Sequence, residues 1–211
     1  ERVKDIAFVQ DRQGVLRKPS ELYDPRVTVI RDLLSSRLPK SPFDQPLHLA
    51  TLTHLGLRSK LSPDAVLASA RQIAADINSK DSDLSAESRK RSIRLLAWLD
   101  LHCSSSWIED MKFVQELRET EWIPVVSSVE DSRLAQSTSA ADRDTSKILS
   151  WTEHSEVVNS PKLTRPHTDT ILVSGVMSIF DGEIRNSFLI QLLGWDQAVN
   201  ASVVAQQLVT I

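Results

Sequence analysis

Cysteine is nearly absent from this sequence of 211 residues: Cys103 is the only one, so no intrachain disulfide bond can form. We therefore expect a reducing, intracellular compartment and a cytoplasmic location. Long apolar runs are absent as well, because the longest, residues 171–179, is interrupted by Ser174, Gly175 and Ser178. A membrane-spanning helix needs about 20 consecutive apolar residues, so we expect no membrane insertion.

The charged residues form no extended block of one sign. The formal net charge is -3, and the longest basic run is Arg89-Lys90-Arg91, which we interpret as part of a solvated helix face. Neutralising the phosphates of a nucleic acid requires a basic face or stripe. We therefore expect no nucleic-acid partner.

What the chain does contain is an ordinary globular composition, with 41% hydrophobic and 25% charged residues. A chain of this length and composition can bury a real core. It begins at Glu1 without a methionine and ends at Ile211 inside an apolar periodic pattern. We therefore expect it to be a piece of a larger protein.

Several short motifs recur in the two halves of the chain. Each half contains an apolar strand, a loop, a Ser-Glu-aliphatic motif, a Leu-Gly step and then a helix. The matching segments are, in order, residues 6–9, 19–25 and 55–57 in the first half and residues 122–126, 155–158 and 193–195 in the second. Motifs that return in the same order indicate a degenerate tandem repeat.

Apolar periodicity and capping residues predict the elements between these motifs. Helices are expected at residues 27–34, 47–55, 62–77, 85–102, 106–118, 187–193 and from 200 onwards, and strands at 6–9, 15–16, 122–126 and 170–180. Ser106 and Glu109 stand in capping-box register, and Gly175 is expected to mark a bulge or a close approach in its strand. Residues 127–147, rich in Ser, Thr, Asp and Ala, predict a mobile surface loop.

These elements predict an α+β fold, in which two degenerate strand-helix repeats are joined by long helices and short sheets carry packed helices. We expect a first repeat at residues 1–77, connecting long helices at 85–118 and a second repeat at 119–211. The three parts form either separate domains or one packed body, and the sequence leaves both arrangements open.

The repeated motifs supply the residues that we expect to have structural roles. They are Pro19, Ser20, Glu21, Leu22, Asp24 and Gly56 in the first repeat and Ser155, Glu156, Gly175 and Gly194 in the second. Glu21 and Glu156 stand at matching places in the motifs. We expect each carboxylate to accept backbone N–H bonds at the start of a helix.

Nucleophilic catalysis has little support in the sequence. Ser174 lies in Val-Ser-Gly-Val-Met-Ser, which lacks the Gly-x-Ser-x-Gly elbow that exposes a nucleophilic serine. His102 and Cys103 are neighbours on a predicted helix, where adjacent side chains point about 100° apart. A cleft between the repeats, around His154 and Glu156, is the candidate site of the alternative hypothesis, a hydrolase-like enzyme.

Metal and cofactor sites have equally little support. His48 and His54 are six residues apart, so they lie on different faces of a helix, unlike the i,i+4 pairs of zinc sites. The loop 153–156 has no further Cys or His cluster near it in the sequence. Asn200 begins a glycosylation triplet, but we interpret it as a helix cap. We therefore expect no bound metal or cofactor.

Taken in order, the motifs resemble the repeat regions of the sacsin family. The resemblance is carried by the strand before the Pro-Ser-Glu-Leu-Tyr-Asp-Pro box at 19–25, by Leu-Gly-Leu at 55–57 and by the second set of motifs. That set includes Trp-Ile-Pro-Val at 122–125, Ser-Glu-Val at 155–157 and Val-Ser-Gly-Val-Met at 173–177. The resemblance covers nearly the whole chain, and its specificity comes from the order and spacing of short motifs.

This resemblance implies a segment of a very large cytosolic protein with a role in chaperone function. Repeat regions of that family begin with an Hsp90-like ATP-binding module, and this segment would come from outside it. The glycine motifs of the module are missing here: no Asp-x-Gly-x-Gly occurs, and all five glycines are isolated. No ATPase residue can therefore be assigned.

The leading hypothesis is a non-catalytic structural and interaction module of a sacsin-like chaperone or co-chaperone. The resemblance implies a part in proteostasis, in intermediate-filament organisation and in mitochondrial distribution. The partners it implies are other domains of the same parent chain and, through the parent, chaperones such as Hsp70 and client or filament proteins. A third hypothesis places a client-binding surface on the Ser-rich loop at 127–147, where phosphorylation would change the charge strongly.

Overall fold

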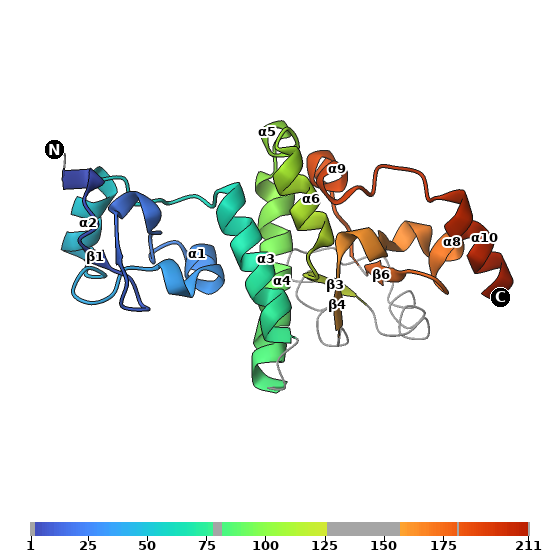
Figure 1. Ribbon diagram of the computed structural model, residues 1–211, viewed down its shortest axis with the longest axis horizontal. Coiled ribbons are helices and arrows are strands. Elements are labelled where there is room, and N and C mark those ends of the chain that lie inside the picture. Colours follow the sequence, from blue (N-terminus) through green and yellow to red (C-terminus); the bar gives the residue numbers. More distant parts are fainter. Residues whose placement is uncertain (1–2, 78–81, 126–156, 181, 211) are drawn as a thin grey trace, which may run out of the picture. The chain divides into compact units, whose positions relative to one another are not determined.

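The computed structural model describes residues 3–77, 82–125, 157–180 and 182–210 (Figure 1). The chain forms two compact units, Glu1–Ser69 and Ala70–Ile211. Both units combine helices with short two-stranded sheets, which confirms the predicted α+β class. Within the described ranges, no helix is long and apolar enough to cross a bilayer.

A β-hairpin lies near the start of the first unit, after a short 3-10 turn, η1 (Val3–Asp5). Strand β1 (Val9–Gln10) pairs antiparallel with strand β2 (Leu16–Arg17). The turn between them contains Gly14 at φ +86°, a conformation that glycine adopts without steric cost. The two short strands predicted on either side of Gly14 are therefore confirmed.

The buried carboxylate of Asp11 closes the hairpin turn. It accepts hydrogen bonds from the backbone N–H groups of Gln13 (3.0 Å) and Val15 (2.8 Å) and from Nε of Arg17 (3.1 Å). Burial by itself raises the pKa of this carboxyl group, but the bonds from Val15, Arg17 and Gln13 outweigh it and hold the pKa below its usual value. Asp11 is thus a charged residue that organises the turn from inside the protein.

The Pro-Ser-Glu-Leu-Tyr-Asp-Pro box folds as a 3-10 turn followed by a buried extended segment. The turn η2 (Pro19–Glu21) begins at a proline, whose missing N–H would have no partner at that position anyway. Glu21 accepts a hydrogen bond from the backbone N–H of Lys18 at 3.1 Å, the type of bond that we expected for its carboxylate. Leu22 and Tyr23, which follow, are completely buried.

Tyr23 connects the box to later segments of the first unit. Its backbone N–H donates to the carbonyl oxygen of Arg37 at 3.1 Å, and it forms a parallel bridge with Arg58. Its phenol oxygen lies 3.0 Å from Oγ of Ser62. The box is therefore fixed by contacts with segments up to 39 residues away.

The helices of the first unit agree with the periodicity of the sequence. They are α1 (Thr28–Leu33), the 3-10 turn η3 (Ser35–Arg37), α2 (Pro46–His54) and α3 (Pro63–Ile77), which continues into the second unit. Gly56, just beyond α2, has φ +105°, as expected for the residue that ends a helix. A small apolar core contains Val9, Leu22, Leu49, Leu52 and Leu57.

Three helices follow α3 in the second unit, and two of them replace a single predicted helix. Helix α4 (Ser82–His102) matches the expected helix, but α5 (Ser105–Ile108) and α6 (Met111–Glu119) replace the single helix predicted at 106–118. The carboxylate of Asp110 accepts a hydrogen bond from the N–H of Phe113 at 3.1 Å. Asp110 therefore caps a new helix, and the capping box predicted for Ser106 is wrong.

The second unit contains two pairs of short strands. Strand β3 (Ile123–Val125) pairs antiparallel with β4 (Val157–Asn159), which confirms the strand predicted around Pro124. Strand β5 (Thr164–Pro166) pairs in parallel with β6 (Ser178–Phe180). A hydrogen bond of 3.0 Å from Nδ2 of Asn159 to Oγ of Ser178 connects the two pairs.

The strand predicted at 170–180 is wrong over most of its length. The 3-10 turn η6 (His167–Asp169) runs directly into α8 (Thr170–Val173), and only the end of the predicted segment, β6, is a strand. In α8 one apolar side chain, Val173, is buried, whereas Ile171 is 87% exposed. A short run of Ile, Leu and Val does not distinguish a helical turn from a strand by periodicity alone.

Asparagine residues cap the last two helices, and the cap at Asn200 was predicted. The side chain of Asn186 accepts the N–H groups of Phe188 and Leu189 at the start of α9 (Ser187–Leu193). Asn200 accepts the N–H of Ser202 at the start of α10 (Ala201–Thr210). Both helix starts therefore follow the asparagine-cap rule.

The two units share part of an order of elements. In the second unit the 3-10 turn that begins with proline is η5 (Pro161–Leu163), which follows a β-strand as η2 does in the first. A buried residue comes next in both units, Leu22 in one and Thr164 in the other. Pro161 therefore takes the same place in this order as Pro19, while residues 155 and 156, which the sequence motifs align with Ser20 and Glu21, lie outside the described residues.

Candidate functional site

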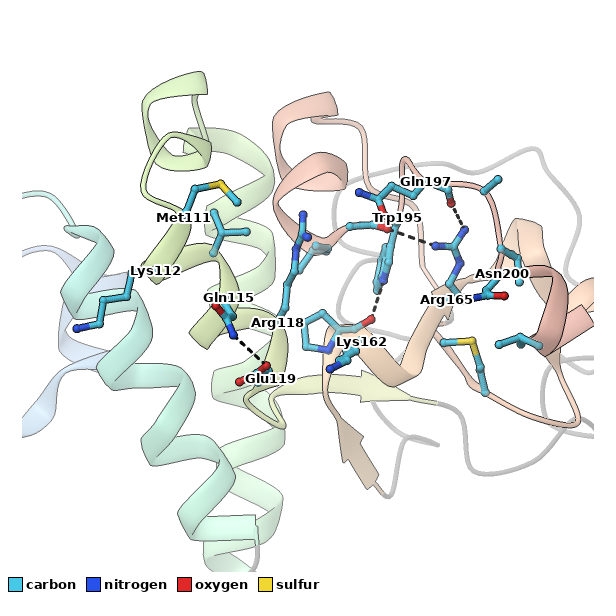
Figure 2. Close-up of a pocket in the computed structure, with 18 residues that line it drawn as sticks. Met111, Lys112, Gln115, Arg118, Glu119, Lys162, Arg165, Trp195, Gln197 and Asn200 are labelled. Atoms are coloured by element: carbon cyan, nitrogen blue, oxygen red, sulfur yellow. Dashed lines mark hydrogen bonds between the residues drawn. The ribbon is translucent and has the colours of Figure 1, made fainter.

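A cavity of about 790 Å³ opens on the surface of the second unit (Figure 2). Its walls come from α6, from the turn η5 with strand β5, and from the segment that follows α9. This volume lies within the range of roughly 300–1,000 Å³ that is usual for ligand sites. The cavity is the candidate functional site.

Arg165, on β5, fixes one wall of the cavity. Its side chain is largely buried, and Nε donates to Asp169 Oδ2 at 2.7 Å. The two terminal nitrogens donate to the carbonyl oxygens of Gly194 at 3.4 Å and Gln197 at 2.8 Å, as Figure 2 shows. One guanidinium thus holds the segment after α9 against β5, while Asp169 compensates its charge.

Arg118, in the last turn of α6, holds the end of α9. Its Nε donates to the carbonyl oxygen of Leu192 at 2.9 Å, and one terminal nitrogen donates to that of Gln191 at 2.6 Å. The final carbonyl groups of a helix lack partners within the helix and carry partial negative charge. A guanidinium satisfies both needs, so α6 and α9 are joined at the cavity.

Gly194 lies where Arg118 meets the end of α9, and we predict that it tolerates no side chain. Its φ is +79°, and a Cβ built on it would lie 3.2 Å from Cζ of Arg118. Gly194→Ala should therefore lower the free energy of unfolding by about 1–3 kcal/mol, since it combines left-handed backbone strain with displacement of the guanidinium. Urea denaturation followed by circular dichroism measures the effect.

Gly175→Ala is the matched control for this prediction, because Gly175 is exposed in the same unit and has no positive φ. We expect the control to unfold within about 0.5 kcal/mol of the wild type. Equal midpoints for Gly194→Ala and the wild type would contradict the prediction.

The inner surface of the cavity is apolar and aromatic. Trp195 is buried, and its ring nitrogen donates to the carbonyl oxygen of Pro161 at 3.2 Å. On its other side it packs against Phe180, with ring centroids 5.6 Å apart. Because this indole is bonded and packed, it forms a rigid base under the opening.

The rim of the cavity is basic and carries flexible apolar side chains. Lys112 on α6 and Lys162 on η5 are exposed, and Met111 is 73% exposed beside Lys112. Glu119 is the acidic residue among the described lining side chains, and Gln115 donates to it at 3.5 Å. The described lining therefore has a positive balance although the chain as a whole carries a formal charge of -3.

The arrangement of these side chains is suited to binding. The two arginines of the lining are bonded to backbone carbonyl groups, and its tryptophan is bonded to Pro161. In the described ranges the lining includes no His, Cys or Ser, and no cluster of three metal-ligating side chains occurs in them. What the cavity offers a ligand is positive charge above an apolar base.

The residues singled out in the sequence do not gather in this cavity. Gly194 lines it, whereas Gly175 lies in the turn after α8, where its N–H donates to Gln207 Oε1 at 2.6 Å. Gly175 therefore marks a turn, and the predicted bulge is wrong. Ser155 and Glu156 lie outside the described residues, as does His154.

The six motif residues of the first repeat lie in the first unit. Ser20 contacts the position that a Cβ on Gly56 would occupy, with 3.7 Å between the two Cβ positions. The carboxylate of Asp24 is nearly buried and receives three hydrogen bonds from the side chain of Arg26, the shortest of 2.7 Å. Leu22 belongs to the core, and Pro19 and Glu21 form the turn η2.

The other nucleophile and ligand candidates are individually engaged. Burial raises the pKa of the Cys103 thiol to about 11, which keeps it protonated at neutral pH. The ring of His102 stacks on Trp98, with centroids 4.7 Å apart. Nδ1 of His48 lies 2.6 Å from the carbonyl oxygen of Pro42.

Sequence reasoning missed Arg118 and Arg165, the two residues that shape the cavity. Each appears in the sequence as an ordinary surface cation, and their carbonyl partners lie 29 to 74 residues further along the chain. Aligning Pro161 with Pro19 would have placed Arg165 directly after a buried position, as Tyr23 is after Leu22. That alignment was the one signal in the sequence that could have singled out Arg165.

Comparison of the chain with protein-family models, with curated proteins and with solved structures finds no match.

Proposed function

We propose that this chain is a non-catalytic structural and interaction module of a sacsin-like, chaperone-associated protein in the cytoplasm. The observation that carries the proposal is the way in which the charged side chains of the cavity are bonded. Arg118 and Arg165 are bonded to backbone carbonyl groups, so they shape the binding surface. Among the described lining residues, the exposed Lys112, Lys162 and Glu119 carry charge that is not used in this way.

The order of elements shared by the two units is the second support. A strand, a 3-10 turn starting with proline, a buried segment and a helix ending at a left-handed glycine occur in each unit. Repetition of a scaffold is typical of proteins that build extended interaction surfaces. It fits the resemblance of the sequence motifs to sacsin repeat regions.

The partners that we propose are those implied by the resemblance. Within the parent protein they are neighbouring domains of the same chain. Through the parent they are chaperones such as Hsp70 and client or filament proteins, with consequences for proteostasis, intermediate filaments and the distribution of mitochondria. The alternative, a hydrolase with a cleft near His154 and Glu156, is left without a supporting contact because both residues lie outside the described ranges.

Suppression of client aggregation tests the proposal. We expect an equimolar amount of the chain to reduce the light scattering of a thermally unfolding test protein by about half, because a module that binds exposed segments lowers the concentration of aggregating species. Serum albumin at the same mass concentration is the control. A chain that leaves scattering unchanged, or that turns over a generic ester substrate at a rate proportional to its concentration, would contradict the proposal.

A further inference from the structure

We propose that the cavity of the second unit binds an extended, acidic peptide segment that carries a bulky apolar side chain. This inference rests on the proposed function and names the chemistry of the partner at its site. It follows from the charge of the rim, the dimensions of the walls and the apolar base. Each of these is a property of the described residues.

Charge complementarity selects an acidic ligand. Lys112 on α6 and Lys162 on the turn η5 are both exposed lining residues, so two of the elements around the cavity carry positive charge. Behind them the guanidinium group of Arg118, bonded to carbonyl oxygens, adds positive potential, whereas the charge of Arg165 is compensated by Asp169. Glu119 offsets a part of this charge at one end. A carboxylate-bearing segment is attracted here, and a basic one is repelled.

The apolar groups select a segment with a large hydrophobic side chain. Met111, Met177 and Val203 line the cavity, and so does the buried Trp195. Methionine side chains are flexible and polarisable, and they are common on surfaces that accept varied apolar partners. One leucine or phenylalanine side chain, flanked by carboxylates, would match this combination of base and rim.

The length of the walls favours an extended chain over a small anion as the ligand. The face of α6 from Met111 to Glu119 is about 12 Å long at the helical rise, which matches about four residues of extended peptide. The segment 197–199, after α9, also lines the cavity and is mostly exposed. Its backbone N–H groups form no hydrogen bond to the part of the chain that the structure describes. They are donors of the kind that an extended peptide pairs with.

Fluorescence anisotropy with labelled hexapeptides tests the inference on the whole chain. The probe alternates acidic residues with two leucines; its matched versions replace the acidic residues by lysine, or the leucines by serine. We expect saturable binding of the first peptide only, weakened at least about fivefold when salt rises from about 0.05 M to about 0.3 M, since exposed charges are screened.

Two pairs of charge reversals locate the site. Lys112→Glu with Lys162→Glu should weaken binding at least about tenfold, because two attractions become repulsions. Lys40→Glu with Lys60→Glu changes the net charge equally at exposed positions of the first unit, and it should bind as the wild type does. Circular dichroism melting checks that both double variants are folded.

Several outcomes would overturn the inference. Equal binding by the two double variants would place the peptide elsewhere, and competition by inorganic phosphate at the same concentration as the peptide would indicate an anion site. If the peptide with serine in place of leucine binds more tightly, the proposed contact with an apolar side chain is wrong. If aggregation is suppressed while no acidic peptide binds, the inference about the cavity fails alone; if the peptide binds and aggregation is unaffected, the proposed function fails.

Discussion

Replacing Trp122 by alanine is expected to lower the free energy of unfolding of the second unit by about 3–5 kcal/mol, the usual cost of truncating a large buried aromatic side chain. Trp122 has no exposed surface, and its ring nitrogen donates to the carbonyl oxygen of Leu117 at 3.1 Å. Its backbone joins Ser92 on α4 and Asn159 on β4. The substitution therefore leaves a cavity and an unpaired carbonyl where helices and strands meet.

Hydrogen exchange followed by mass spectrometry is the measurement that suits this prediction, because it reports on each segment. We expect faster exchange in α4, α6 and β3 of Trp122→Ala. Trp107→Ala is the matched control: Trp107 is only partly buried, so we expect a loss of less than about half as much. If the two variants exchange equally, Trp122 is not the centre of the second unit.

Asp11→Ala is expected to lower the free energy of unfolding of the first unit by about 3 kcal/mol. The carboxylate is fully buried, and its loss leaves the N–H groups of Gln13 and Val15 and the side chain of Arg17 without their acceptor. Asp44→Ala, at an exposed position of the same unit, is the control and should change stability by less than about 0.5 kcal/mol.

The dependence on pH provides an independent test of the same group. The pKa of Asp11 lies below its ordinary value of 3.8 in the folded protein, because its hydrogen bonds outweigh the effect of burial. Folded protein therefore binds fewer protons than unfolded protein, and the stabilisation by Asp11 is present above pH 3.8 and is lost as pH falls through the lowered pKa. Asp24 has a lowered pKa for a similar reason, its pairing with Arg26.

Acid titration of the unfolding midpoint, from neutral pH to about pH 2, measures this loss. The wild type should lose stability below pH 3.8, whereas Asp11→Ala should lose distinctly less over the same interval. Parallel curves for the two proteins would show that the carboxylate does not stabilise the fold.

Local signals in the sequence predicted most helices correctly. Asn186 and Asn200 cap helices as their side-chain chemistry predicts, and Gly56 and Gly194 adopt the positive φ that ends a helix. Each of these signals acts within four residues of its position. Short-range hydrogen bonding and backbone sterics decide them, so no knowledge of the tertiary fold is needed.

The incorrect predictions, by contrast, concern features that short-range signals do not decide. The turn at Asp110 and the helix α8 depend on choices between conformations that local pattern leaves nearly equal, and packing in the folded unit decides between them. The cavity was not predicted, because it is built from carbonyl groups on α9 and on the segment after it, and from cations on α6 and β5. Residues so far apart in the sequence produce no periodic pattern that would indicate their contact.

Arg165 has a consequence for the interpretation of inherited sequence variants. A lysine at this position would usually be scored as a mild change, since size and charge are similar. A single ammonium group, however, cannot reproduce the planar fork that contacts Asp169, Gly194 and Gln197 together. The Arg165→Lys protein would thus retain its net charge but lose the connection between β5 and the segment after α9.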